Sequence, residues 1–304
     1  MNLELEFITR IYHSTLKIGP QHTMSSSLSP DIVLQTSQLD THLNKAHILF
    51  VFVGSETAFR EAHIPGSQHI KPSELVCGIA PAAGKIADAD DLTLLFSRIG
   101  LNDNSIVIAY DDEGGGWAGR LIWTLDVIGH NNYHYLDGGL VAWLGENRET
   151  ESGPSKNNSV DSNDSSFIEV EIDTALIVTA DNIIESLSND NFIVWDARSP
   201  QEYSGEKVLA ARGGHIPGAA NINWLDLMDR NNFLRLKPLA TIQTMLADKN
   251  LTTDKTIVTH CQSHHRSGLT YLVGKIIGLN IKAYDGSWSE WGNLKNTPID
   301  NSAS

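Results

Sequence analysis

The sequence has too few cysteines for a disulfide framework. Only Cys77 and Cys261 occur among its 304 residues, whereas secreted domains that depend on disulfides carry many paired cysteines. Free thiols persist best in a reducing compartment, so we expect the protein to be cytoplasmic.

Long apolar runs and an excess of basic residues are also missing. No apolar run approaches the ~20 residues that a membrane span requires, so we expect no membrane partner. The 37 acidic residues outnumber the 22 basic ones, and the formal net charge is -15. This charge opposes binding to nucleic acid, because backbone phosphates are neutralised by Lys and Arg. It also means that an anionic substrate requires a local positive pocket.

The N-terminal segment does not fit a secretory signal. It contains Glu4 and Glu6 and has no compact apolar stretch before a small-residue cleavage site. We expect residues 1–29 to form a flexible extension, with Met24 as an alternative start of the chain.

Two motifs recur in the two halves of the chain. HIPG occupies residues 63–66 and again 215–218, and DGGLVAW at 137–143 is echoed by DGSWSEW at 285–291. The motifs keep the same order at nearly the same offset. Ordered repeats of this kind indicate a duplicated domain.

Each half alternates strand patterns with helical patterns. Short apolar runs such as 105–110 and 255–260 contrast with longer helical patterns such as 269–277. Strands that alternate with helices predict parallel pairing and right-handed crossovers. We therefore predict an α/β fold of two similar domains, each a central, mainly parallel sheet with helices on both faces.

The domain boundary is predicted from composition. The stretch 151–167 is polar and rich in Ser and Asn, which is typical of a linker. We expect one domain over residues 30–150 and a second over residues 168–300.

The segment most suited to chemistry follows the strand that ends at His260. A six-residue loop begins with Cys261, and a helix is expected from about Ser267. Backbone N–H groups of such a loop and the helix dipole form an anion site that stabilises a thiolate. A thiolate held in this way is a nucleophile. The loop consists of Cys261, Gln262, Ser263, His264, His265 and Arg266.

Three other interpretations of this loop are weaker. Cys261 as a small buried hydrophobe is disfavoured because the loop is polar and cationic. A metal site is disfavoured because no second Cys/His pair stands at suitable spacing. A cysteine phosphatase would need a Cys-x5-Arg loop, whereas Arg266 makes this loop one residue shorter. Cys77 has no charged neighbour in sequence, and we expect it to be structural.

Three motifs resemble the start, middle and end signatures of the rhodanese family. They are WDARSP at 195–200, GHIPGA at 214–219 and DGSWSEWG at 285–292. The resemblance covers almost the whole chain and is closest to the tandem-domain sulfurtransferases that use thiosulfate or 3-mercaptopyruvate. It implies an active cysteine in the second domain and a catalytically inactive first domain. In agreement, Asp111 occupies the position that matches Cys261.

The loop sequence CQSHHR resembles the CQTHHR loop of bacterial thiosulfate sulfurtransferases. The loops CGSGV of mercaptopyruvate enzymes and CRKGV of mammalian-type thiosulfate enzymes match it less well. The resemblance implies that Cys261 takes sulfur from thiosulfate and passes its persulfide sulfur to cyanide or another thiophilic acceptor. The alternatives are a 3-mercaptopyruvate sulfurtransferase and a persulfide carrier that serves a partner protein.

The resemblance also suggests which residues bind the donor. Arg120 matches a position whose arginine helps to bind the donor anion, and an arginine fork suits sulfonate-like oxygens. No metal or organic cofactor is implied, and we expect a monomer. The expected donor-binding residues are Arg120, Gln262, Ser263, His264, His265 and Arg266.

Overall fold

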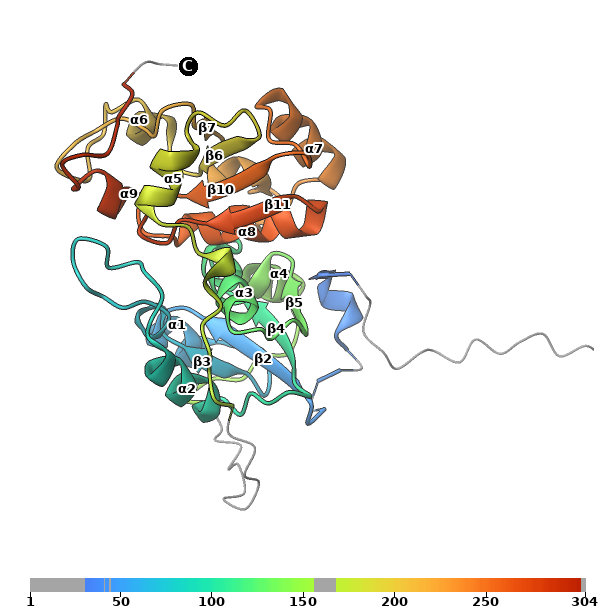
Figure 1. Cartoon of the computed structure of the whole chain (residues 1–304). Helices are drawn as coiled ribbons and strands as arrows, with labels where there is room; N and C mark the ends of the chain where they lie inside the picture. The colour runs from blue at the N-terminus through green and yellow to red at the C-terminus, as the bar shows by residue number, and fades with distance from the viewer. Residues whose placement is uncertain (1–30, 41, 44, 156–167, 302–304) are drawn as a thin grey trace, which may run out of the picture.

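The computed structural model describes residues 31–40, 42–43, 45–155 and 168–301. The first domain, blue to green in Figure 1, lies below the second, which runs from yellow to red. The predicted N-terminal extension and most of the predicted linker lie outside the described residues.

The first domain is built on a five-stranded sheet in the order β1-β5-β4-β2-β3, and every neighbouring pair is parallel. Its strands are β1 (Val33–Leu34), β2 (Ile48–Val53), β3 (Gln68–Ile70), β4 (Ile106–Tyr110) and β5 (Tyr133–Leu136). Its helices are α1 (Glu56–Glu61), α2 (Ala89–Arg98), α3 (Gly116–Val127) and α4 (Gly139–Gly145), with short 3-10 turns at Thr36–Gln38 and Pro72–Glu74.

Strand β2 shows why this sheet needs helices on both faces. All six of its residues are buried, and successive side chains point to opposite faces of a strand. Phe50 packs with Phe59 of α1 and Trp143 of α4. Val51 belongs to the cluster on the other face, which includes residues of α2 and α3. A strand buried on both faces is characteristic of a parallel sheet between two helical layers.

The second domain repeats this plan with a four-stranded parallel sheet in the order β11-β10-β6-β7. Its strands are β6 (Phe192–Asp196), β7 (Ala220–Asn221), β10 (Thr256–His260) and β11 (Asn280–Ala283), beside an antiparallel pair of β8 (Met228–Asp229) and β9 (Arg235–Leu236). Its helices are α5 (Ala180–Ser186), α6 (Pro200–Tyr203), α7 (Leu239–Asp248), α8 (Arg266–Ile277) and α9 (Ser287–Trp291), with 3-10 turns at Thr174–Leu176 and Trp224–Leu227. The predicted fold class is confirmed.

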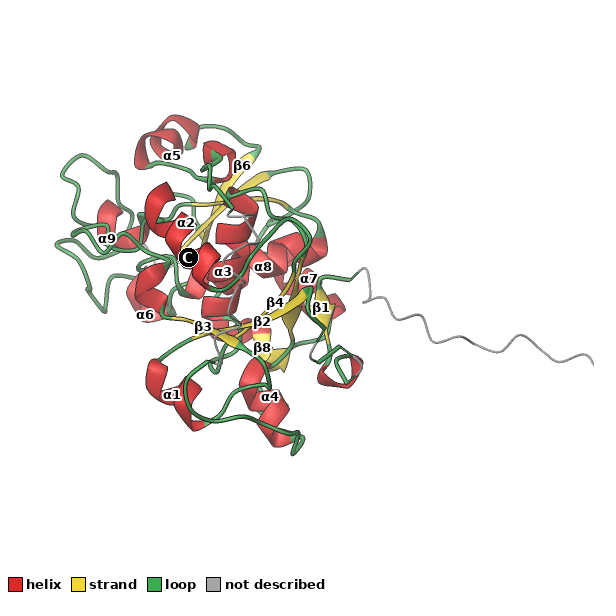
Figure 2. Cartoon of the chain, turned by 90° about the horizontal axis from the view of Figure 1, so that it is seen from below, coloured by secondary structure: helices red, strands yellow, loops and turns green. Residues whose placement is uncertain are grey.

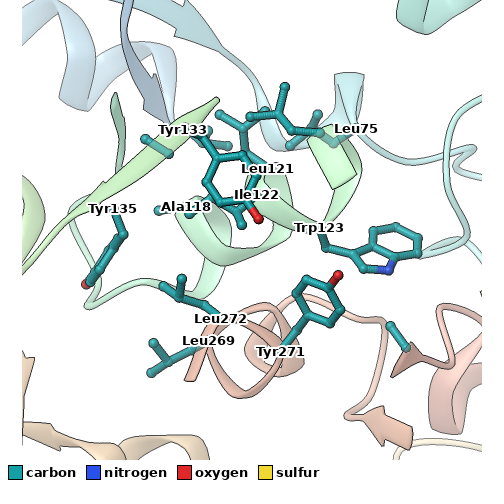
Figure 3. Close-up of a cluster of buried hydrophobic side chains, with 14 of the residues drawn as sticks. Leu75, Ala118, Leu121, Ile122, Trp123, Tyr133, Tyr135, Leu269, Tyr271 and Leu272 are labelled. Atoms are coloured by element: carbon teal, nitrogen blue, oxygen red, sulfur yellow. The ribbon is translucent and has the colours of Figure 1, made fainter. Parts of the chain in front are cut away.

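The two domains share one hydrophobic cluster at the crossing of α3 and α8. The two helices lie side by side at the centre of the molecule (Figures 1 and 2). Figure 3 shows Leu121 and Ile122 of α3 near Leu269 and Leu272 of α8. Because apolar surface is buried continuously across this boundary, the domains are held in a fixed relation.

Glycines allow α3 and α8 to approach closely. A Cβ atom on Gly119 would lie 2.3 Å from the carbonyl oxygen of Gly268, and one on Gly268 would lie 2.3 Å from that of Gly116. A polar contact adds to this crossing, because the Tyr271 hydroxyl donates to the Asp126 carboxylate at 2.8 Å.

We expect Gly119→Ala to destabilise the protein by about 1–3 kcal/mol, because the added methyl group overpacks the crossing. In an ordinary helix interior the same change stabilises by up to ~1 kcal/mol. The sign of the change in urea-induced unfolding therefore tests the contact. As a control, Gln243→Ala on the exposed face of α7 should stay within about 0.5 kcal/mol of wild type. A stabilised Gly119→Ala variant would contradict the close approach.

Candidate active site

Cys261 lies where strand β10 ends and helix α8 begins. Its side chain is fully buried. Ser267, in the first turn of α8, donates hydrogen bonds to the sulfur from its hydroxyl and from its backbone N–H. The N-terminal end of a helix favours negative charge, so this position suits a thiolate.

Helix α9 holds the loop from the other side. The backbone N–H groups of Trp288 and Ser289 donate to the carbonyls of Cys261 and Gln262 at 3.0 and 2.9 Å. The recurring DGSWSEW motif at 285–291 therefore fixes the loop that carries the cysteine.

The thiol of Cys261 is surrounded by compensating charge. Burial raises its pKa, but the Arg266 cation, the two hydrogen bonds from Ser267 and the nearby His265 together lower the pKa below its usual value. A lowered pKa increases the fraction of thiolate at neutral pH, which is the nucleophilic form.

Arg266 is held by a carboxylate that lies far away in the sequence. Its Nη1 and Nη2 atoms donate to the two oxygens of Glu202 at 2.7 and 2.9 Å. Burial raises the pKa of Glu202, but the bonds from Arg266 and Ser199 prevail and bring it to about 2. The fork of Arg266 is therefore directed at Glu202.

His264 is fully buried and adopts a left-handed backbone conformation with φ of 53°. Its Nδ1 atom lies 2.7 Å from the Ser267 hydroxyl oxygen. The ring meets Trp123 of α3 edge-on, with 4.5 Å between ring centroids. Burial and the charge of Arg120 hold the pKa of His264 well below its usual range, so the imidazole is neutral.

Of the other loop residues, His265 and Ser263 contact the first domain and Gln262 contacts the second. His265 is hydrogen-bonded to Glu113 and stacks on Trp117, with 4.3 Å between ring centroids. The side-chain amide of Gln262 donates to the carbonyl of Leu209 at 3.1 Å. The backbone of Ser263 lies so close to Gly84 that a Cβ atom there would be 2.1 Å from the Ser263 carbonyl oxygen.

Arg120 is fully buried between the domains. Its Nη1 and Nη2 atoms donate to the carbonyls of Gly84 and Leu75, each at 2.8 Å, and Nη1 also reaches the carbonyl of His264 at 3.4 Å. Burial lowers its pKa to about 10, although the charges of Asp285 and Cys261 oppose that change. Arg120 is thus an interface residue beside the loop, and its predicted contact with a donor anion stays a prediction.

Asp111 fills the corresponding loop of the first domain. One carboxylate oxygen accepts the N–H groups of Glu113, Gly114 and Gly115 at 2.9–3.2 Å. The other accepts those of Trp117 and Ala118 at 3.0 Å. Burial and the charge of Glu113 raise the pKa of Asp111 to about 6, while the hydrogen bonds oppose the rise. This loop is therefore an anion cradle whose anion is part of the chain.

Sequence reasoning missed Glu202 and Glu113, the two carboxylates that hold Arg266 and His265. The pattern of Ser199 and Glu202 could have identified a capping box at the start of α6, which the structure contains. It could not have identified a partner 64 residues away.

Cys77 is not part of the loop that carries Cys261. Cys77 is partly buried, and its sulfur accepts the N–H of Ile79 at 3.5 Å. Across residues 31–155 and 168–301, leaving out 41 and 44, no group of three or more metal-binding side chains comes together. No helix in the same residues has the length and apolar character that a membrane span needs.

These features define the class of protein. It is a two-domain α/β protein with a thiol at a helix N-terminus in the second domain and a carboxylate at the matching place in the first. The Rhodanese-like domain family matches residues 35–146 and 179–294. The chain belongs to the rhodanese family, which confirms the predicted resemblance.

Curated relatives extend over nearly the whole chain. The thiosulfate sulfurtransferase of Azotobacter vinelandii is 41% identical over 91% of this chain and 100% of its own length. The enzyme of the same name from Pseudomonas aeruginosa is 41% identical over 88% of this chain and 97% of its own length. The sulfur carrier protein TtuD of Thermus thermophilus is 30% identical over 89% of this chain and 96% of its own length.

Solved structures share the fold at low sequence identity. Wild-type EanB matches with a TM-score of 0.73 at 17% identity, and YnjE matches with 0.71 at 19%. The matches cover 85% and 84% of this chain but only 64% and 62% of those chains. These similarities support the fold and nothing more specific.

We expect the pair of Glu202 and Arg266 to stabilise the folded protein less as the pH falls toward about 2. Because the pKa of Glu202 is lowered on folding, its contribution is fully present above the unfolded value of about 4.3. It is lost as the pH falls through the folded value of about 2. The loss corresponds to roughly 2–3 kcal/mol of unfolding free energy. Urea unfolding at a series of acidic pH values measures it.

Glu202→Gln should remove this acid dependence, although it lowers stability at neutral pH by leaving Arg266 without its partner. Glu74→Gln is a matched control, because Glu74 pairs with Arg98 at 2.8 Å in a more exposed position. The control should keep the wild-type acid dependence. If the free energy of unfolding falls equally with pH in wild type and in Glu202→Gln, this role of Glu202 is contradicted.

Proposed function

We propose that this chain is a thiosulfate sulfurtransferase that carries sulfur as a persulfide on Cys261. The observation that supports it most is a buried thiol at the N-terminus of α8 whose pKa is lowered, as a nucleophilic cysteine requires. The 41% identical relatives of that name support the choice of donor.

In the proposed first step, the Cys261 thiolate attacks the outer sulfur of thiosulfate. A new S–S bond forms, the S–S bond of the donor breaks, and sulfite leaves with its electron pair. In the second step, cyanide or another thiophile attacks the outer sulfur of the persulfide, and the Cys261 thiolate leaves. Neither step needs a metal or an organic cofactor. Two free thiols fit a cytoplasmic location, which belongs to the same proposal.

The donor dianion needs positive surroundings, because the chain as a whole carries a charge of -15. In this proposal the partly exposed residues Gln262, Ser263 and His265 line the donor site. Arg266 adds positive charge to it, while its terminal nitrogens stay bonded to Glu202. His264 and Arg120 are fully buried, so they contribute to the site from behind the loop.

The described contacts favour sulfur transfer over phosphate-ester hydrolysis. A cysteine phosphatase needs the fork of its loop arginine for phosphate oxygens. Here both terminal nitrogens of Arg266 are bonded to Glu202. A persulfide carrier remains the second candidate, supported by the similarity to the sulfur carrier protein TtuD.

We expect thiocyanate to form from thiosulfate and cyanide over many turnovers, at a kcat/KM about tenfold or more above that with 3-mercaptopyruvate. Cys261→Ser should abolish the reaction, since a hydroxyl cannot carry sulfane sulfur. Cys77→Ser should leave turnover nearly intact. Steady-state kinetics with both donors test this, and a single stoichiometric transfer would indicate a carrier instead. A preference for 3-mercaptopyruvate would overturn the proposed donor.

Arg120→Ala distinguishes a donor contact from an indirect role. If Arg120 binds thiosulfate, the variant should lose roughly 10- to 100-fold in kcat/KM for the donor step. The attack of an uncharged thiol on preformed persulfide should then change much less. Stopped-flow measurement of each half-reaction separates the two steps. Equal losses in both steps, or none in either, would contradict direct binding of the donor by Arg120.

A further inference from the structure

The side chains of Ser267 and His264 form a chain of contacts that leads away from the Cys261 sulfur. The Ser267 hydroxyl contacts the sulfur, and on its other side lies Nδ1 of His264 at 2.7 Å. All three side chains are fully buried. Water therefore does not compete for these hydrogen bonds, and their directions are set by the protein alone.

The surroundings of His264 determine which ring nitrogen carries its hydrogen. The neutral imidazole has one N–H, at either Nδ1 or Nε2. Nε2 is buried and has no hydrogen-bond partner among the described residues. A hydrogen there would be a buried donor without an acceptor, which proteins rarely tolerate. The hydrogen therefore belongs on Nδ1, where it is donated to the Ser267 oxygen.

This arrangement leaves the Ser267 hydroxyl only one role. Its oxygen already accepts from His264, so its own hydrogen is free to point at the sulfur. If His264 carried its hydrogen on Nε2, the hydroxyl would instead donate to the bare Nδ1, and the sulfur anion would lose a donor.

Residues of the first domain keep His264 in this state. The carbonyl of His264 accepts from Arg120 at 3.4 Å, and its ring meets Trp123 of α3 edge-on. The cation beside the ring disfavours an imidazolium, and the indole fixes the ring plane. The charged and titratable groups around the pair are Cys261, His265 and Arg266 of the loop and α8, Arg120 of α3 and His260 of β10.

We propose that His264 is a positioning residue that holds the Ser267 hydroxyl as a hydrogen-bond donor to the Cys261 sulfur, with Arg120 and Trp123 of the first domain holding His264 in place. The inference rests on the proposed role of Cys261 as the sulfur carrier. The same hydrogen bond stabilises the thiolate before sulfur is taken up and the thiolate that leaves when sulfur is delivered. The inactive first domain thus acts on the nucleophile through a side chain of the second.

The test follows the ionisation of Cys261 by the ultraviolet absorbance of the thiolate as a function of pH, in a Cys77→Ser background so that one thiol titrates. Ser267→Ala should raise the midpoint by about one pH unit, the effect of one hydrogen bond to a charged group. His264→Ala should raise it similarly. His264→Asn should restore most of the shift, because its amide N–H lies near the place of Nδ1 and Asn tolerates positive φ.

The double variant His264→Ala/Ser267→Ala decides whether the two residues act in one chain. Its midpoint should equal that of Ser267→Ala alone, since His264 acts only through the hydroxyl. Additive shifts, or no rescue by His264→Asn, would overturn the proposal. His215→Gln is the control, because His215 is a buried histidine of the same domain that bonds the carbonyl of Tyr203. It should not move the midpoint.

This measurement needs no sulfur donor, so its result does not depend on which donor the protein uses. Thiocyanate formation by the Cys77→Ser protein tests the proposed function separately. If the protein forms thiocyanate but the midpoint shifts are additive, the positioning role of His264 is refuted and the proposed function stands. If the shifts are non-additive but neither donor is turned over, the positioning role of His264 stands and the proposed function is refuted.

Discussion

The constraint on which this structure depends is the burial of an ionisable thiol at the end of a parallel strand. A thiolate out of contact with water is costly unless hydrogen bonds and a counter-charge replace its hydration. The loop after β10 supplies both, through Ser267 at the start of α8 and Arg266 beside it. Glu202 and helix α9 hold these groups in turn. The site therefore depends on the groups that contact Cys261 and on the residues that hold those groups in place.

The first domain meets the same constraint in a different way. Its loop has the same position between strand and helix, but the Asp111 carboxylate occupies the cradle and accepts five backbone N–H groups. The carboxylate is part of the chain, so the backbone N–H groups of this loop have an acceptor without a bound ligand. The first domain thus has the architecture of an anion site with a carboxylate where the second domain has a thiol.

The first domain still shapes the active loop, because α3 and α8 cross within contact distance. Through this crossing, Arg120 reaches the backbone of His264, Trp123 contacts its ring, and Glu113 holds His265. None of these side chains needs to touch a substrate to affect the nucleophile. The low dielectric constant of a buried interface strengthens such interactions, so a cation or an indole outside the loop can influence the charge within it.

The α/β class, the duplication, the cysteine and the family can all be predicted from the sequence, because these follow from local periodicity, repeats and short motifs. The strand-loop-helix context of Cys261 is likewise a local property, so the loop residues can be identified from the sequence. The folded structure is needed to show which groups face one another across 64 to 152 residues of chain, as Glu202 faces Arg266 and Glu113 faces His265. It also shows that Arg120 is enclosed by backbone carbonyls and that the buried His264 ring is bonded to Ser267. The physical reason is that burial and partner choice arise from packing between helices, and no local pattern in the sequence encodes them.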